Sequence, residues 1–242
     1  MPVRDLLAKV PLTKPKRIID LGCGPGNSTV VLAERFPEAK IMGIDSSTDM
    51  LEKARQALPN VEFKEADLKA YEPDDSADLF FSNAVFHWLP RRQRLAIMKN
   101  ILSSSSSGTV LAIQVPNNDR EPSHAKMRQV ARELKTEAGM GNNNPLNTPF
   151  PTPGELYNSL KPLCSHIEVW RTIYNHVLED HQGIIEWVKG TGLRPFIDPL
   201  PKEQRKAYLQ RYLEEMKKAY EPLSDGRVML RYPRLFLVAV RK

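Results

Sequence analysis

The chain has 242 residues, of which 41% are hydrophobic and 26% are charged, as is typical of a globular protein that can bury a sizeable core. Its 35 basic and 29 acidic residues give a net charge of +6, but the basic residues are scattered, and we interpret the run RRQR at residues 91–94 as a solvated helix face. These features exclude a basic stripe for nucleic acid, and no apolar run is long enough to span a bilayer, so we expect neither nucleic acid nor a membrane as a partner.

The first half of the chain alternates strand-like and helix-like segments. The predicted strands are residues 16–21, 40–45, 61–65, 77–82 and 108–115, and the predicted helices are residues 27–36, 47–58 and 91–102. Strands that alternate with helices favour an α/β fold, with a doubly wound, mostly parallel sheet joined by right-handed crossovers.

The pattern changes after residue 115. The predicted helices are now residues 123–139, 153–160, 181–190 and 201–220, the predicted strands are 166–177 and 234–240, and the Asn- and Pro-rich segment 141–153 is a predicted loop. We expect a single domain over residues 1–242 rather than separate domains. Its segments 116–165 and 178–233 are expected to form a mainly helical cap over the carboxyl edge of the sheet.

The two cysteines, Cys23 and Cys164, are too few for a disulfide scaffold and lack the spacing of metal ligands. The N-terminal sequence MPVRDLLAKVPL lacks the apolar stretch of a secretory signal. We therefore expect a cytoplasmic protein with reduced thiols and no metal, acting as a monomer or a weak homo-oligomer.

The strongest motif is DLGCGPGN at residues 20–27, which follows the first predicted strand and opens a helix. Its glycines Gly22, Gly24 and Gly26 permit a tight turn that a ligand can approach closely. The spacing is G-x-G-x-G and not the G-x-G-x-x-G of dinucleotide sites, and Asp20 precedes it. An acid there disfavours a pyrophosphate and suits a cationic ligand, although an ordinary glycine-rich turn remains the simpler alternative.

Two further acids, Asp45 and Asp67, follow the second and third predicted strands. An acid in the position of Asp45 can bind both ribose hydroxyls of a nucleoside, and a carboxylate at Asp67 can accept a hydrogen bond from an adenine amino group. Each acid alone could be a helix N-cap. Together with Asp20 they indicate one crevice at the carboxyl ends of three strands.

These residues, with the segment SNAVFHWL at residues 82–89, resemble the class I S-adenosylmethionine-dependent methyltransferases. The segments FSNAVFHWLP, WRTIYNH, IIEWVKGTGLRPF and PRLFLVA resemble the trans-aconitate methyltransferase family more closely. The resemblance implies a seven-stranded sheet with an antiparallel seventh strand, and S-adenosylmethionine as cofactor with S-adenosylhomocysteine as product. It also implies transfer of the methyl group to a carboxylate of a small polycarboxylic acid, trans-aconitate first, giving a monomethyl ester.

The resemblance further implies roles for individual residues. Those expected to bind the cofactor are Asp20, Gly22, Gly24, Gly26, Asn27, Asp45, Ser46, Met50, Asp67, Leu68, Asn83 and Ala84. Those expected to contact the substrate are His87, Trp88, Arg171, Arg194 and Arg234.

The surroundings of the arginines support this on chemical grounds. Arg171 follows Trp170 in an alternating strand, and Arg194 lies in the apolar, glycine-marked segment GTGLRPF. A guanidinium group matches a carboxylate with two parallel hydrogen bonds, so these arginines can hold a small anionic substrate. The alternative for Arg194 is a structural ion pair with an acid such as Asp198. A carboxylate substrate needs no general base at neutral pH, so we expect His87 to supply shape and a hydrogen bond.

Two other functions remain open from the sequence. One is a small-molecule methyltransferase with a different substrate, acting by O- or C-methylation. The other is a weakly catalytic S-adenosylmethionine-binding protein, because members of the family usually begin earlier, with an aromatic-rich stretch that helps to cover the cofactor. A nucleic-acid methyltransferase is disfavoured, because SNAV lacks the Pro-Pro-aromatic motif that receives a flipped base.

Overall fold

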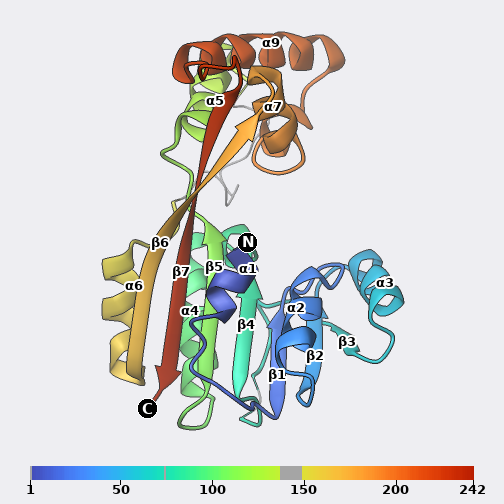
Figure 1. Ribbon diagram of the computed structural model, residues 1–242, viewed down its shortest axis with the longest axis vertical. Helices are drawn as coiled ribbons and strands as arrows, with labels where there is room; N and C mark the ends of the chain where they lie inside the picture. The colour runs from blue at the N-terminus through green and yellow to red at the C-terminus, as the bar shows by residue number, and fades with distance from the viewer. Residues whose placement is uncertain (1, 74, 137–148) are drawn as a thin grey trace. The chain divides into compact units, whose positions relative to one another are not determined.

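The computed structural model describes residues 2–73, 75–136 and 149–242 (Figure 1). These residues form two compact units: Met1–Val115, Phe150–Arg171 and Leu235–Lys242 make up the first, and Pro116–Pro149 and Thr172–Arg234 make up the second. Most of the predicted loop at 141–153 lies outside the described residues, as does the end of the helix predicted at 123–139.

A seven-stranded sheet in the order β3-β2-β1-β4-β5-β7-β6 organises the first unit, and its strands β6 and β7 extend into the second unit. Its strands are β1 (Arg17–Leu21), β2 (Lys40–Asp45), β3 (Glu62–Glu65), β4 (Leu79–Asn83), β5 (Val110–Pro116), β6 (Cys164–Leu178) and β7 (Val228–Arg241). The first five strands pair in parallel. The strand β7 runs antiparallel to β5, because the N–H of Gly108 donates to the carbonyl of Arg241 while the N–H of Arg241 donates to the carbonyl of Thr109. The predicted fold class is therefore confirmed.

The strand order fixes where a ligand can bind. The chain moves from β1 to β2 and β3 on one side, then returns to place β4 and β5 on the other side of β1. Open α/β sheets bind their ligands at such a reversal, outside the carboxyl ends of the two central strands. The glycine loop that follows β1 and the segment that follows β4 both lie there.

Helices flank this sheet; in Figure 1, α1 lies in front of it and α4 behind it. The helical segments of the first unit are α1 (Pro2–Leu7), α2 (Asn27–Arg35), α3 (Thr48–Ala57), α4 (Arg91–Ser103) and α6 (Pro153–Leu160), with the 3₁₀ turns η1 (Phe86–Trp88) and η4 (Lys161–Leu163). Buried apolar residues of the central strands, among them Ile19, Leu21, Phe80 and Ile113, form the core between them. The nearly continuous apolar strands are typical of a parallel sheet covered on both faces.

The structure corrects the interpretation of residues 91–94 as a solvated face. Arg94 is only 1% exposed, whereas Arg91 and Arg92 are exposed. The reason is helical periodicity: Arg94 shares the buried face of α4 with Met98 and Leu102, four and eight residues further on.

The second unit contains α5 (Pro122–Glu133), α7 (His181–Lys189), α8 (Arg194–Ile197) and α9 (Lys202–Ala219). Helix α5 packs against α9. Two buried tyrosines of α9 tie the pair together: the Tyr208 hydroxyl donates to the Met127 carbonyl (2.7 Å) and the Tyr212 hydroxyl donates to the Ser123 carbonyl (2.8 Å). The helix α6, which falls in the predicted cap segment 116–165, belongs to the first unit. The placement of a cap over the sheet stays a prediction.

Candidate functional site

The glycine loop between β1 and α2 has a backbone that only glycine adopts easily. Gly22, Gly24 and Gly26 have φ angles of 71°, 54° and 91°. At Gly22 the approach of a neighbour is equally restrictive, because an added Cβ would lie 2.5 Å from the methyl groups of Val85. The N–H groups of Gly22 and Cys23 both donate to the carbonyl of Ile44, at 2.8 and 2.9 Å, which fixes the loop against the end of β2.

Asp20 lies beneath this loop and is fully buried. Its Oδ2 accepts hydrogen bonds from the hydroxyls of Ser28 (2.8 Å) and Thr29 (2.7 Å) at the start of α2. Among the described residues, its Oδ1 has no hydrogen-bond partner. Burial, reinforced by the charge of Asp45, raises the pKa of Asp20 to about 6 despite the two hydroxyl donors. Asp20 therefore supports the loop and helix from below.

Asp45 joins the end of β2 to the glycine loop. Its Oδ2 accepts the N–H of Gly24 (2.9 Å), and its Oδ1 accepts the N–H of Ser47 (2.9 Å). Each carboxylate oxygen can accept a second hydrogen bond, and the side chain is only half-buried. Asp45 is thus held rigidly while retaining acceptor capacity toward the open side of the loop.

Asp67, after β3, is in a more polar setting. Its side chain is 45% exposed and forms an ion pair with the Lys69 ammonium (3.1 Å). The N–H of Lys69 also donates to its Oδ1 (3.0 Å), and this backbone hydrogen bond is the main reason why the pKa of Asp67 lies below its ordinary value. Asp67 is therefore ionised at neutral pH.

The segment after β4 forms the facing side of the site. The side-chain amide of Gln114 donates to Asn83 Oδ1 (2.9 Å), and the N–H of Ala84 donates to the Gln114 carbonyl (2.8 Å). Ala84 has a φ of 62°, a left-handed conformation that is uncommon for residues other than glycine. This turn directs the chain from β4 into η1, and such strained backbone is concentrated at functional sites.

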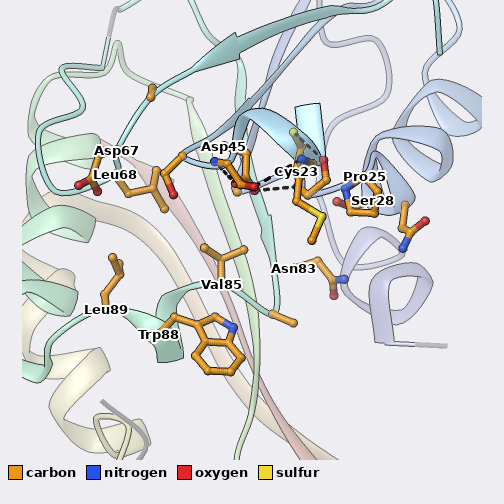
Figure 2. A pocket seen from close by; sticks show the side chains of 18 of the residues that line it. Cys23, Pro25, Ser28, Asp45, Asp67, Leu68, Asn83, Val85, Trp88 and Leu89 are labelled. Carbon is orange, nitrogen blue, oxygen red and sulfur yellow. Dashed lines mark hydrogen bonds between the residues drawn. The ribbon is translucent and has the colours of Figure 1, made fainter. Parts of the chain in front are cut away.

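A pocket of about 580 Å³ lies among these elements, all of them in the first unit (Figure 2). It is lined by Gly22, Cys23, Gly24, Pro25, Asn27, Ser28, Asp45, Ser46, Ser47, Met50, Ala66, Asp67, Leu68, Lys69, Asn83, Ala84, Val85, Trp88 and Leu89. All the residues predicted to bind the cofactor line this pocket except Asp20 and Gly26. Of the residues predicted to contact the substrate, Trp88 lines the pocket and His87 does not.

The predicted arginines are not gathered within one unit. Arg171 is an exposed residue of the first unit, and Arg194 and Arg234 belong to the second. The Nε of Arg194 donates to Asp198 Oδ2 (3.1 Å), in an exposed pair, which is the alternative that the sequence left open. The Arg234 guanidinium lies 4.9 Å from the centre of the Tyr232 ring, and burial lowers its pKa. Substrate binding by these arginines stays a prediction.

Several apolar and small residues of the pocket wall were not predicted from the sequence, chiefly Cys23, Ala66, Val85 and Leu89. Their only signal is that they are neighbours of predicted residues along the chain. Cys23 and Cys164 are both buried free thiols, and burial raises the pKa of Cys23 to about 12, so its thiol is not a nucleophile at neutral pH. Within the described ranges, metal-ligating side chains do not gather in groups of three, and no helix has the length and apolar character of a membrane span.

The strand order, the glycine loop after β1 and the acids at the strand ends define a class I S-adenosylmethionine-dependent methyltransferase. A family model described as a methyltransferase domain matches residues 18–108. The trans-aconitate 2-methyltransferase of Rhodopseudomonas palustris strain BisB18 is 49% identical over 240 residues, covering 99% of this chain and 93% of the relative. That of Rhizobium rhizogenes strain K84 is 48% identical and covers 100% of this chain and 93% of the relative. The chain belongs to the trans-aconitate 2-methyltransferase family.

Solved structures agree on the fold. The YcgJ protein of Bacillus subtilis superposes with a TM-score of 0.64 at 12% identity, covering 100% of this chain and 98% of that one. An S-adenosylmethionine-dependent methyltransferase of Mesorhizobium loti superposes with a TM-score of 0.52 at 19% identity, covering 98% of this chain and 96% of that one. At such identities the likeness shows the fold alone.

Proposed function

We propose that this chain transfers a methyl group from S-adenosylmethionine to a carboxylate of a small polycarboxylic acid, with trans-aconitate as the first candidate, giving a monomethyl ester. The observation that carries the proposal is the identity of 45–49% to relatives named trans-aconitate 2-methyltransferase, over nearly the full length of both chains. The proposed substrate is thus a small anion.

The residues of the pocket fit S-adenosylmethionine. The pocket's volume of about 580 Å³ lies in the range of small-molecule sites. The remaining lone pairs of Asp45 can accept ribose hydroxyls, and the apolar side chains of Met50 and Leu68 can flank an adenine ring. The bare backbone of the glycine loop and the turn at Ala84 would take the amino-acid part of the molecule. An acid-lined pocket also suits the positive charge of a sulfonium group.

The chain's own contribution to catalysis is positioning. When bound, S-adenosylmethionine supplies an electrophilic methyl group that a carboxylate oxygen can accept. Such an oxygen is already deprotonated at neutral pH, so the protein has no proton to remove from it. Arginine side chains would hold the carboxylates that do not react and so select the one that does. Alignment of two bound reactants is worth on the order of 7–11 kcal/mol, and exclusion of water favours a step in which opposite charges are neutralised.

The decisive experiment combines binding and transfer. Calorimetry first measures S-adenosylmethionine binding, and a panel of di- and tricarboxylic acids is then incubated with the chain and methyl-labelled cofactor. We expect the label to appear on trans-aconitate and to be released by mild alkali as methanol, because esters are hydrolysed by base. An alkali-stable product would identify an ether- or carbon-methylating enzyme instead. Tight binding without transfer to any acid would identify a cofactor-binding protein.

A further inference from the structure

Helix α4 carries a buried cation close to the pocket. The Arg94 side chain is among the largest that are fully buried in the described chain. Burial, and to a lesser degree the charge of Arg91, lowers its pKa to about 10, so the guanidinium stays protonated at neutral pH. A buried charge is costly unless hydrogen bonds compensate it, so its hydrogen bonds should indicate what it stabilises.

Two hydrogen bonds of the guanidinium go to the backbone of the turn before the helix. Arg94 Nε donates to the carbonyl of Leu89 (2.8 Å), and Arg94 Nη2 donates to the carbonyl of His87 (2.9 Å). The Phe150 ring lies over the guanidinium, 5.4 Å from its carbon. The turn η1 itself uses other carbonyls: the N–H of Trp88 donates to Val85, and that of Leu89 donates to Phe86. The guanidinium therefore adds hydrogen bonds to two carbonyls, those of His87 and Leu89, that these backbone bonds do not use.

The same turn forms a wall of the pocket. Val85, Trp88 and Leu89 line it, and Figure 2 shows them on the side opposite Asp45. Val85 also holds the glycine loop in register, because its methyl groups occupy the space beside Gly22. A shift of η1 would therefore move the pocket wall together with the methyl groups that pack beside Gly22.

We propose that Arg94 is a positioning residue for the methyl-donor site: by binding the carbonyls of His87 and Leu89 it fixes the turn that carries Trp88 and Leu89 into the pocket. The inference rests on the proposed function, because it assumes that this pocket binds S-adenosylmethionine. It adds a residue outside the pocket to the determinants of donor affinity.

The test uses Arg94→Met, which keeps the length of the side chain but removes its donors, and Arg94→Lys, which keeps the charge. An ammonium cannot match the planar, two-bond geometry of the guanidinium. Arg92→Met, an exposed arginine on the same helix, is the matched control. Calorimetry with S-adenosylmethionine measures the dissociation constant and, separately, the fraction of molecules that bind. Thermal unfolding is followed in parallel.

Arg94→Met removes both hydrogen bonds to the turn, and we expect it to raise the dissociation constant about tenfold, a change comparable in free energy to one charge-assisted hydrogen bond, with Arg94→Lys intermediate and Arg92→Met unchanged. If Arg94→Met does not fold, Arg94→Lys decides the question by the same shift. A smaller binding fraction with an unchanged dissociation constant would mean that Arg94 only stabilises the fold, and would overturn the inference. Failure of the unmodified chain to bind would reject the proposed function, and the inference with it.

Discussion

The carboxylate of Asp45 accepts the backbone N–H of Gly24 across the ends of two strands, at 2.9 Å. Its other oxygen accepts the N–H of Ser47, also at 2.9 Å. The acid proposed to bind ribose thus also holds the glycine loop in its ligand-accepting shape. One side chain therefore couples the conformation of the loop to the binding of the nucleoside.

This coupling makes Asp45→Asn informative. The amide keeps the shape of the side chain but turns one acceptor into a donor that faces a backbone N–H. We expect the affinity for S-adenosylmethionine to fall about ten- to a hundredfold, the worth of a hydrogen bond to a charged group. Calorimetry measures the loss, and Asp49→Asn, on the exposed surface of α3, serves as control. Equal affinities for both variants would contradict the role of Asp45.

A second prediction concerns Gly22→Ala. The left-handed backbone at Gly22 and the Val85 methyl groups, 2.5 Å from an added Cβ, both oppose a side chain. Strain and overpacking together should lower the free energy of unfolding by about 2–5 kcal/mol. Urea denaturation measures this change. In Gly154→Ala, where an added Cβ meets nothing within 4 Å, the same measurement should show no loss; a comparable loss there would mean that crowding at Gly22 is not the cause.

The elements that the sequence predicted well are those with local signals. The acid-terminated apolar run of β2 and the proline-opened helix α6 have the predicted bounds. Strand β7 begins at Val228 and not at residue 234: the exposed Met229 and Arg231 alternate with buried residues, but Pro233 interrupts the pattern in the sequence. These boundaries depend on neighbouring strands, which a linear pattern does not contain.

The same distinction holds for the site. Glycines and acids at strand ends could be recognised, since their chemistry is specific and their positions follow from strand endings. Val85 and Leu89 could not, because only the path of η1 brings these apolar residues to the pocket. Arg94 was misinterpreted for a related reason: in a run of four consecutive polar residues, the sequence does not indicate that one side chain faces the core.

Asp20 predicts a pH dependence of stability. Its pKa rises from an ordinary 3.8 to about 6 in the folded chain. Below about pH 3.8 the carboxyl is protonated in both states and its contribution is fully present. As the pH rises to about 6, the unfolded chain releases the proton while the folded chain retains it, so stability is lost. The difference between the two pKa values corresponds to a loss of roughly 3 kcal/mol in the free energy of unfolding.

We therefore expect the chain to lose this stability relative to Asp20→Asn between pH 4 and pH 6, a window that follows from the same pKa values. Chemical denaturation at several pH values measures the difference between the two proteins. Asp225→Asn is a control in which stability should depend on pH in the opposite direction. The hydrogen bond from Arg227 lowers the pKa of Asp225, so its contribution to stability is lost as the pH falls. A difference between the chain and Asp20→Asn that does not change with pH would contradict the prediction.

A glutamate with a nearly inaccessible side chain forms three ion pairs in the second unit. Glu215, whose side chain is 4% exposed, accepts hydrogen bonds from Lys126 (2.7 Å), Arg211 (2.7 Å) and Lys218 (3.0 Å). These bonds, led by that from Lys126, lower its pKa to about 2, so its contribution is present above pH 4.5 and is lost as the pH falls toward 2. Glu215→Gln should cost about 3 kcal/mol at neutral pH. Glu214→Gln, with a half-exposed side chain, should cost under about 0.5 kcal/mol in the same denaturation experiment.

Arg194 and Asp198 offer a way to separate an ion pair from a substrate contact. The two side chains bind one another at 3.1 Å and are both more than half exposed, so the pair itself contributes little stability. Arg194→Ala and Asp198→Ala break the same pair. Any effect that only the first variant has must therefore come from another partner of the guanidinium.

We expect Arg194→Ala to raise the KM for the acid about tenfold or more, the worth of one charge-assisted hydrogen bond, while the affinity for S-adenosylmethionine stays unchanged. Asp198→Ala should keep the KM or lower it, because it releases the guanidinium for a carboxylate of the substrate. Steady-state kinetics with trans-aconitate measure both variants. If the two variants change the KM equally, Arg194 acts only through its bond to Asp198, and the contact with the substrate must fall to Arg171 and Arg234.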